Sequence, residues 1–187
     1  MDSTGASSKR LIYLAGFMGS GKSTLGPILA NSLGFAFVDV DKLIEQRSGK
    51  RVAEIFDQMG EKSFRALEHA ILEEVASMKE GVVSLGGGTV ANPENLDLIR
   101  STGIMVYLQL PPEEAVKRMK NKTDRPMLKD AGGNKLSHDE LQARILELLA
   151  KREPFYLQAD LVIPTEGRNV GGTVDEIVHR LRRFIKF

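Results

Sequence analysis

One eight-residue segment, from Gly16 to Ser23, restricts the fold of this 187-residue chain more than any other feature. It reads GFMGSGKS and fits the pattern G-x-x-x-x-G-K-[ST]. A short apolar run from Leu11 to Ala15 precedes it, and the apolar residues that follow, up to Gly34, recur at helical spacing. We therefore expect a strand, a glycine-rich turn and the start of a helix, an arrangement typical of α/β proteins.

The residues of this turn predict a phosphate site. Glycines let backbone N–H groups surround an anion, and the helix N-terminus adds the positive end of its dipole. Lys22 would reach the terminal phosphates of a nucleoside triphosphate, and the Ser23 hydroxyl would hold Mg²⁺. The predicted ATP-binding residues here are Gly19, Ser20, Gly21, Lys22, Ser23 and Thr24. The motif alone leaves open a small-molecule kinase, a GTPase-like switch and an ATPase or binding module.

The rest of the chain alternates apolar bursts with helical patterns. We expect further strands at 35–38, 81–85, 104–108 and 160–163, and helices at 42–48, 51–59, 63–79, 112–119, 137–152 and 173–185. Such alternation predicts a parallel sheet with helices on both faces, whose ligands bind at the carboxyl ends of the strands. Residues 1–187 are expected to form a single domain, with a disordered tail at 1–9 and a mobile lid at about 121–136.

Composition argues against several classes of protein. With 26 basic and 25 acidic residues the net charge is +1, so no bulk charge favours nucleic acid or an anionic membrane. The absence of cysteine excludes disulfides, thiolate metal sites and a cysteine nucleophile. The apolar runs are far shorter than the roughly 20 residues of a membrane span, and the first nine residues lack the core of a signal peptide. We expect a cytoplasmic protein.

Two short segments fit GTPase motifs in an unsuitable context. Residues 57–60 read DQMG and residues 121–124 read NKTD. Each motif should follow a strand, so that the first aspartate reaches Mg²⁺ and the second segment reads guanine. Here the first continues a helical pattern and the second follows the helix that ends near Met119, so a GTPase is not favoured.

Asp39 and Asp41 come directly after the second predicted strand, on the ligand side of the sheet. Phosphoryl transfer needs positioning, charge neutralisation and an acceptor for the proton of the alcohol. An ionised aspartate is a weak base, but it suffices when the proton leaves late in a loose transition state. The alternative is that one aspartate caps the helix at Lys42 and the other is solvated, and the residues alone leave both open.

Two arginines could hold an anionic acceptor. Arg65 and Glu68 are i, i+3 neighbours on the 63–79 helix, so Glu68 could fix the Arg65 fork for a carboxylate. Arg152 continues an apolar stripe of its helix, where a charge must find a partner or extend to solvent. A surface ion pair and a solvated helix end are the respective alternatives, and both stay open.

Glycines and a loop arginine complete the candidate set. Gly86, Gly87 and Gly88 follow the third predicted strand, where they could expose backbone N–H groups and leave room for a substrate, or simply form a flexible turn. Arg125 lies in the 121–136 loop. A lid that closes over ATP could deliver it to the transferring phosphate, whereas a solvated loop charge is the simpler alternative.

Taken in order, six segments resemble shikimate kinase: GFMGSGKST, DVD, GEKSFRALE, SLGGGTV, TDRPML and KREPFY. They extend from Gly16 to Tyr156, and the ordered set is specific. The resemblance implies a three-layer P-loop fold with a five-stranded parallel sheet in the order 2-3-1-4-5, usually monomeric. It also implies ATP-dependent phosphorylation of the 3-hydroxyl of shikimate with Mg²⁺, in the pathway to chorismate and the aromatic amino acids.

The resemblance implies a role for each candidate on the acceptor side. Asp41 would bind the reacting hydroxyl and act as base. Arg65 and Arg152 would bind the shikimate carboxylate, and Glu68 would orient Arg65. Gly87, flanked by Gly86 and Gly88, would contact the substrate.

On the nucleotide side, the resemblance implies that Asp39 stands near Mg²⁺, through water, and that Arg125 is the lid arginine on ATP. The adenine contacts are weakly marked, with Arg118 and Arg168 as candidates. A kinase for another small hydroxy acid or polyol such as gluconate is an alternative, as is a non-catalytic nucleotide-binding relative. A nucleoside monophosphate kinase is less favoured because no base-reading lid pattern is found.

Overall fold

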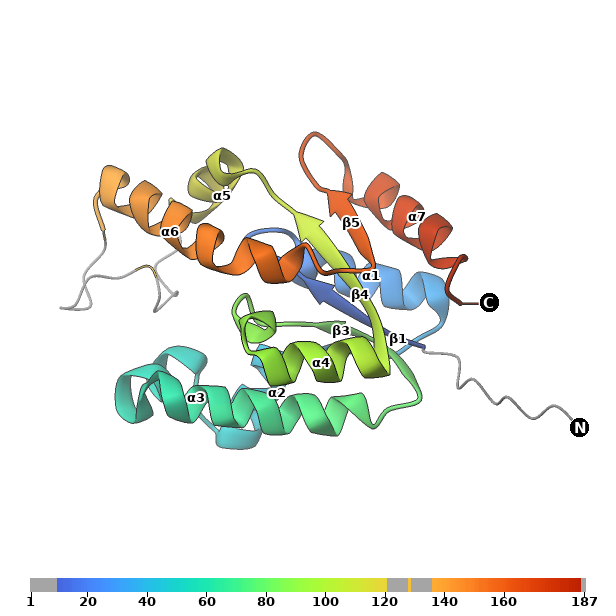
Figure 1. Ribbon diagram of the computed structural model, residues 1–187, viewed down its shortest axis with the longest axis horizontal. Helices are drawn as coiled ribbons and strands as arrows, with labels where there is room; N and C mark the ends of the chain where they lie inside the picture. The colour runs from blue at the N-terminus through green and yellow to red at the C-terminus, as the bar shows by residue number, and fades with distance from the viewer. Residues whose placement is uncertain (1–9, 121–127, 129–135, 186–187) are drawn as a thin grey trace, which may run out of the picture.

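The computed structural model describes residues 10–120, 128 and 136–185. Its strands form one parallel sheet in the order β2-β3-β1-β4-β5, as predicted (Figure 1). The strands are β1 (Arg10–Ala15), β2 (Phe37–Asp39), β3 (Glu80–Ser84), β4 (Gly103–Gln109) and β5 (Leu161–Pro164). The α/β fold class is therefore confirmed.

Seven α-helices and the short 3₁₀-helix η1 lie between and after these strands in the described part of the chain. They are α1 (Lys22–Leu33), α2 (Val40–Ser48), α3 (Val52–Ala76), η1 (Thr89–Ala91), α4 (Pro93–Thr102), α5 (Pro112–Met119), α6 (His138–Tyr156) and α7 (Val170–Leu181). None of the described helices combines the length and the apolar character that a membrane crossing needs.

The structure differs from the expected elements at several places, and α7, for example, begins and ends three to four residues earlier than expected. The second strand begins at Phe37 because the backbone N–H of Phe35 still caps α1, donating to the carbonyl of Ala30. Helix α6 continues past Arg152 through Pro154, which lies in its last turn. No helix was predicted at α4, although Asn92 accepts a hydrogen bond from the N–H of Glu94 and so marks its start.

Helix α3 joins the two helices expected at 51–59 and 63–79. Gly60, with a φ of +78°, is the non-helical residue between them. Asp57 lies inside the first of these segments, as expected, so the 57–60 segment does not follow a strand. The 121–124 segment lies outside the described residues.

Alternation along the strands divides the core into two layers. Leu11 and Tyr13 of β1 face a cluster that contains residues of α2, α3 and α4. Ile12 and Leu14 face the opposite cluster, which contains residues of α1 and α7. Figure 1 shows α1 and α7 together on one side of the sheet and α3 with α4 on the other. The sheet is therefore buried on both faces, as predicted for parallel strands.

The strand order brings three chain segments to one edge of the sheet. Asp39 of β2 pairs with Ser84 of β3, which in turn pairs with Leu14 of β1. The carboxyl ends of these three strands are therefore level. The turn after β1, the start of α2 and the glycines after β3 must lie close together, at the place where open α/β sheets bind ligands.

Gly103, at the opposite end of β4, provides a test of the packing. A Cβ there would lie 2.4 Å from the ring of Tyr13 and 2.6 Å from the backbone oxygen of Leu11, which cannot move aside easily. We expect Gly103→Ala to lower the free energy of unfolding by about 1–3 kcal/mol, measured by urea denaturation.

Gly171→Ala is the matched control. Gly171 lies in α7, and the nearest atom to an added Cβ is 3.7 Å away. Because alanine favours helix over glycine, we expect unchanged or slightly raised stability. Equal stability of the two variants would contradict this account of the core.

Candidate active site

The turn between β1 and α1 has the conformation expected of an anion site. Gly19 and Gly21 have φ angles of +82° and +99°, in the left-handed region that favours glycine. Nζ of Lys22 donates to the carbonyl oxygens of Gly16 and Phe17 at 2.7 and 3.2 Å, so the lysine folds back over the turn. A phosphate in the turn would offer the ammonium group a charged acceptor in place of neutral carbonyls.

A cavity opens beside this turn, and we name it the phosphate cavity. Its lining consists of Met18, Gly19, Gly21, Lys22, Ser23, Thr24, Asp39, Asp41, Ser84, Leu85, Gly87 and Met119. It brings together most of the predicted ATP and Mg²⁺ residues. Ser20 is the exception within the turn, because its side chain is buried and its N–H donates to the carbonyl of Phe17 at 3.1 Å.

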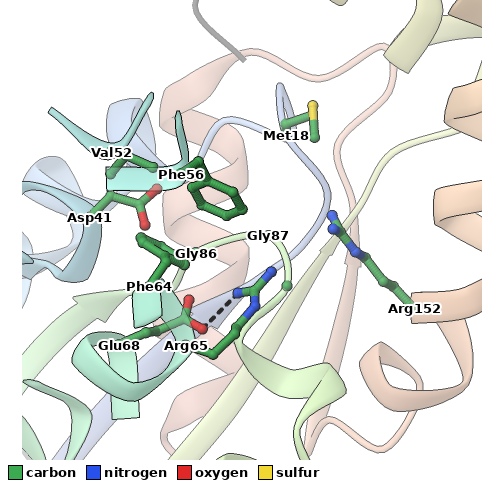
Figure 2. Close-up of a pocket in the computed structure, with 11 residues that line it drawn as sticks. Met18, Asp41, Val52, Phe56, Phe64, Arg65, Glu68, Gly86, Gly87 and Arg152 are labelled. Atoms are coloured by element: carbon green, nitrogen blue, oxygen red, sulfur yellow. Dashed lines mark hydrogen bonds and ion pairs between the residues drawn. The ribbon is translucent and has the colours of Figure 1, made fainter. Parts of the chain in front are cut away.

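A second cavity adjoins the first, and we name it the arginine cavity (Figure 2). Its lining consists of Met18, Asp41, Val52, Phe56, Phe64, Arg65, Glu68, Gly86, Gly87, Gly88 and Arg152. Both cavities are lined by Met18, Asp41 and Gly87. A group bound among the arginines would therefore meet a group bound at the phosphate turn beside Asp41.

The two aspartates predicted after β2 have different surroundings. Oδ1 of Asp39 accepts the backbone N–H of Lys42 at 3.2 Å, so Asp39 caps α2. Asp41 lies in the first turn of that helix and lines both cavities. The capping alternative therefore describes Asp39, which also lines the phosphate cavity, and a merely solvated position does not describe Asp41.

Arg65 is held by acidic side chains of its own helix. Nη1 of Arg65 lies 2.7 Å from Oε2 of Glu68, and Nη2 lies 3.1 Å from Oε1 of Glu61. Burial disfavours the charge of Arg65, but attraction by Glu68 and Glu61 outweighs it and raises the pKa of the guanidinium. Glu68 is fully buried, so this is more than a surface ion pair.

Arg152 reaches the arginine cavity from the opposite side (Figure 2). It is buried but forms no salt bridge with any carboxylate in the described part of the chain. Burial lowers the pKa of Arg152, and the nearby charge of Arg65 acts in the same direction, while Tyr156 and Glu61 oppose them. Arg65 is thus paired with Glu68, whereas Arg152 lines the same cavity without an ion pair of its own among the described residues, which suits an anionic ligand beside Arg152.

Two of the three glycines after β3, Gly86 and Gly88, are required by the groups that converge on them. A Cβ at Gly88 would lie 2.6 Å from Nη2 of Arg65, and one at Gly86 would lie 2.8 Å from Glu68 and 3.0 Å from Asp41. Any side chain at these two positions would displace a functional group. The segment is therefore more than a flexible turn.

The nucleotide-side candidates fall into three groups. Nη1 of Arg118 donates to the carbonyl of Gly19 at 2.9 Å, which places Arg118 against the phosphate turn. Arg168, in contrast, forms an ion pair with Glu176 of α7 and lines neither cavity. Arg125 and the predicted lid lie outside the described residues.

Sequence reasoning did not single out two kinds of residue at this site. Val52, Phe56 and Phe64 form an apolar wall of the arginine cavity. In the sequence, their helical spacing resembles that of ordinary core residues. The hydroxyl of Tyr156 donates to the carbonyl of Gly87 and so joins α6 to the glycine turn. Tyr156 follows Arg152 at i+4, so the two side chains share one face of α6. This spacing could have indicated that Tyr156 lies near the site.

The sheet order, the phosphate turn and the adjoining arginine cavity define a P-loop phosphotransferase with a nucleoside-monophosphate-kinase-like fold. The family model described as shikimate kinase matches residues 18–182. A shikimate kinase from Chlorobaculum parvum is 51% identical over 176 residues, which cover 94% of each chain. This chain belongs to the shikimate kinase family.

Solved structures agree with this assignment. The crystal structure of shikimate kinase from Bacteroides thetaiotaomicron is similar with a TM-score of 0.84 and 36% identity, over 92% of this chain and 98% of that chain. The shikimate kinase from Acinetobacter baumannii in complex with shikimate gives a TM-score of 0.85 and 32% identity, over 96% of this chain and 97% of that chain.

Proposed function

We propose that this chain transfers the γ-phosphoryl group of ATP to the 3-hydroxyl of shikimate, giving ADP and shikimate 3-phosphate. One observation carries the proposal. The phosphate cavity and the arginine cavity meet at Asp41 and Gly87. A triphosphate at the turn and a carboxylate at the arginines would therefore place a phosphoryl group and a hydroxyl on either side of one aspartate.

In the proposed reaction, different residues bind the phosphates, orient the hydroxyl and accept its proton. The hydroxyl oxygen attacks the γ-phosphorus while the bond to the bridging oxygen breaks, and its electron pair stays with ADP. Asp41 orients the hydroxyl and accepts its proton as the new bond forms. Lys22 leaves the carbonyls of Gly16 and Phe17 and neutralises charge on the phosphates. From the resemblance, Arg125 would add charge at the γ-phosphoryl group.

The side chains at the phosphate cavity fit Mg²⁺. Ser23 and Asp39 both line it, and the described residues contain no cluster of three or more acidic, histidine or cysteine ligands. Mg²⁺ keeps several waters and takes one or two protein oxygens together with phosphate oxygens, so this sparse donor set is suitable. Bound there, the ion would neutralise charge on the β- and γ-phosphates.

The lining of the arginine cavity supports shikimate over an open-chain polyol. Arg65 and Arg152 suit the carboxylate, and the wall formed by Val52, Phe56 and Phe64 suits the apolar face of a ring. Gluconate would meet the same arginines but would place hydroxyls against that wall, where they would lack partners. We propose that the enzyme acts as a monomer, as the resemblance to shikimate kinase implies.

A coupled assay of ADP release tests the proposal directly. With ATP and Mg²⁺ present, we expect strong turnover with shikimate and little with quinate, gluconate or nucleoside monophosphates. Turnover with gluconate instead would keep the kinase and overturn the acceptor. A folded protein that binds ATP but turns over none of these acceptors would favour the non-catalytic alternative.

Asp41→Asn tests the proton acceptor. The amide keeps the size of the side chain but cannot take the proton, so we expect kcat to fall roughly 100-fold or more. KM for ATP should change little, because the phosphate turn is intact. A kcat close to that of the wild type would remove Asp41 from this role.

A further inference from the structure

A group of buried polar side chains lies behind Arg65, and the roles described above do not account for it. Oε2 of Glu68 is bonded to Arg65, and Oε1 of Glu68 accepts the hydroxyl of Thr89 at 2.6 Å. Glu68 and Thr89 are both 0% exposed. Each oxygen of the buried carboxylate therefore has a different donor, one a guanidinium and the other a hydroxyl.

The hydroxyl of Thr89 fixes the rotation of the Glu68 carboxylate about its terminal torsion, which packing alone does not fix. The terminal torsion of a glutamate is broad, so hydrogen bonds set the plane of its carboxylate. Without Thr89, Oε1 of Glu68 would be a buried charged oxygen that has lost its donor, and the carboxylate would gain by turning. Because Arg65 binds the other oxygen, such a turn would also move the Arg65 guanidinium.

The other acidic partner of Arg65 cannot take over this function. The side chain of Glu61 is 54% exposed, and its distances to Nε and Nη2 of Arg65 are 3.3 and 3.1 Å. Ion pairs with exposed carboxylates are weak and poorly fixed in orientation. The direction of the Arg65 fork therefore depends mainly on Glu68.

Thr89 is itself held on two sides. Its backbone N–H donates to the carbonyl of Gly86 at 3.2 Å, and its carbonyl accepts the side-chain amide of Asn95 at 3.1 Å. The amide oxygen of Asn95 lies 2.6 Å from Nδ1 of His69, on the same helix as Arg65 and Glu68. Helices α3 and α4 and the glycine turn thus fix the Thr89 backbone from which the hydroxyl reaches Glu68.

We propose that Thr89 is a positioning residue for the acceptor: through Glu68, its hydroxyl holds Arg65 in the orientation that receives the acceptor carboxylate. The proposal rests on the proposed role of Arg65 as a ligand of shikimate. Thr89 lines neither the phosphate cavity nor the arginine cavity, so it acts through Glu68 and not by contact with a substrate.

Calorimetric titration of shikimate into three variants tests this role. Thr89→Val keeps the shape of the side chain but removes the hydroxyl, and we expect it to raise Kd for shikimate about tenfold. Thr89→Ser keeps the hydroxyl and should stay within about twofold of the wild type. Thr102→Val is the matched control, because it removes a part-buried hydroxyl, bonded to Tyr13 and Leu98, at the far end of α4.

Two further measurements separate positioning from a general loss of structure. The affinity for ATP should be unchanged in Thr89→Val, and a parallel loss for ATP and shikimate would overturn the proposal. In an Arg65→Met background, Thr89→Val should cause no further loss of shikimate affinity. A full tenfold loss that persists without Arg65 would show that Thr89 acts by another route.

A last measurement keeps the proposal testable even where the proposed function fails. If the wild-type protein binds ATP but not shikimate, the proposed function is wrong, while the positioning of Arg65 can still be observed. NMR of the Arg65 guanidinium nitrogens should then show an ordered group in the wild type and Thr89→Ser, and a mobile one in Thr89→Val. An equally ordered Arg65 in Thr89→Val would overturn the proposal.

Discussion

The site depends on close approach at the three glycines that follow β3. Asp41 and Glu68 come within 3.0 Å of the point where a Cβ of Gly86 would lie, and Arg65 comes within 2.6 Å of the corresponding point at Gly88. Arg152 lies 3.5 Å from that point at Gly87. Side chains from α2, α3 and α6 can therefore converge on one short segment because that segment has no side chains of its own.

The two arginines of the arginine cavity differ in their electrostatic surroundings. Arg65 is neutralised by Glu68 and Glu61 and is thereby fixed in place. Arg152 is buried without a carboxylate among the described residues, at some expense in stability. An acceptor carboxylate would supply the ion-pair partner that Arg152 lacks among the described residues. Arg152 therefore lowers the stability of the free protein and raises its affinity for an anion.

Much of the fold followed from local patterns in the sequence. The run before Gly16 and the alternation of strands with helices predicted the parallel sheet, whereas the order of its strands came from the resemblance to a family. The i, i+3 spacing predicted the pair of Arg65 and Glu68. Burial of Glu68 could not be predicted in this way, because it results from η1 and α4 packing on α3, a contact between segments distant in sequence.

The remaining differences between the predictions and the structure also arise from contacts between segments. Helix α4 was not anticipated, although Asn92 and Pro93 form a recognisable start, and the strand at β2 was placed too early because Phe35 completes the cap of α1. Arg168, a candidate for adenine, forms an ion pair with Glu176 of the next helix that was not anticipated, and its contact with adenine stays a prediction. Such pairings depend on which helices lie side by side, which residue spacing within one segment does not reveal.

The central claim is that the charge of Arg152 is complemented by the carboxylate of the acceptor. Calorimetry with shikimate and with its uncharged methyl ester, on the wild type and on Arg152→Met, tests it most directly. The account predicts that the wild type prefers shikimate by about tenfold or more, and that Arg152→Met loses most of this preference. An equal preference for shikimate in both proteins would contradict the account.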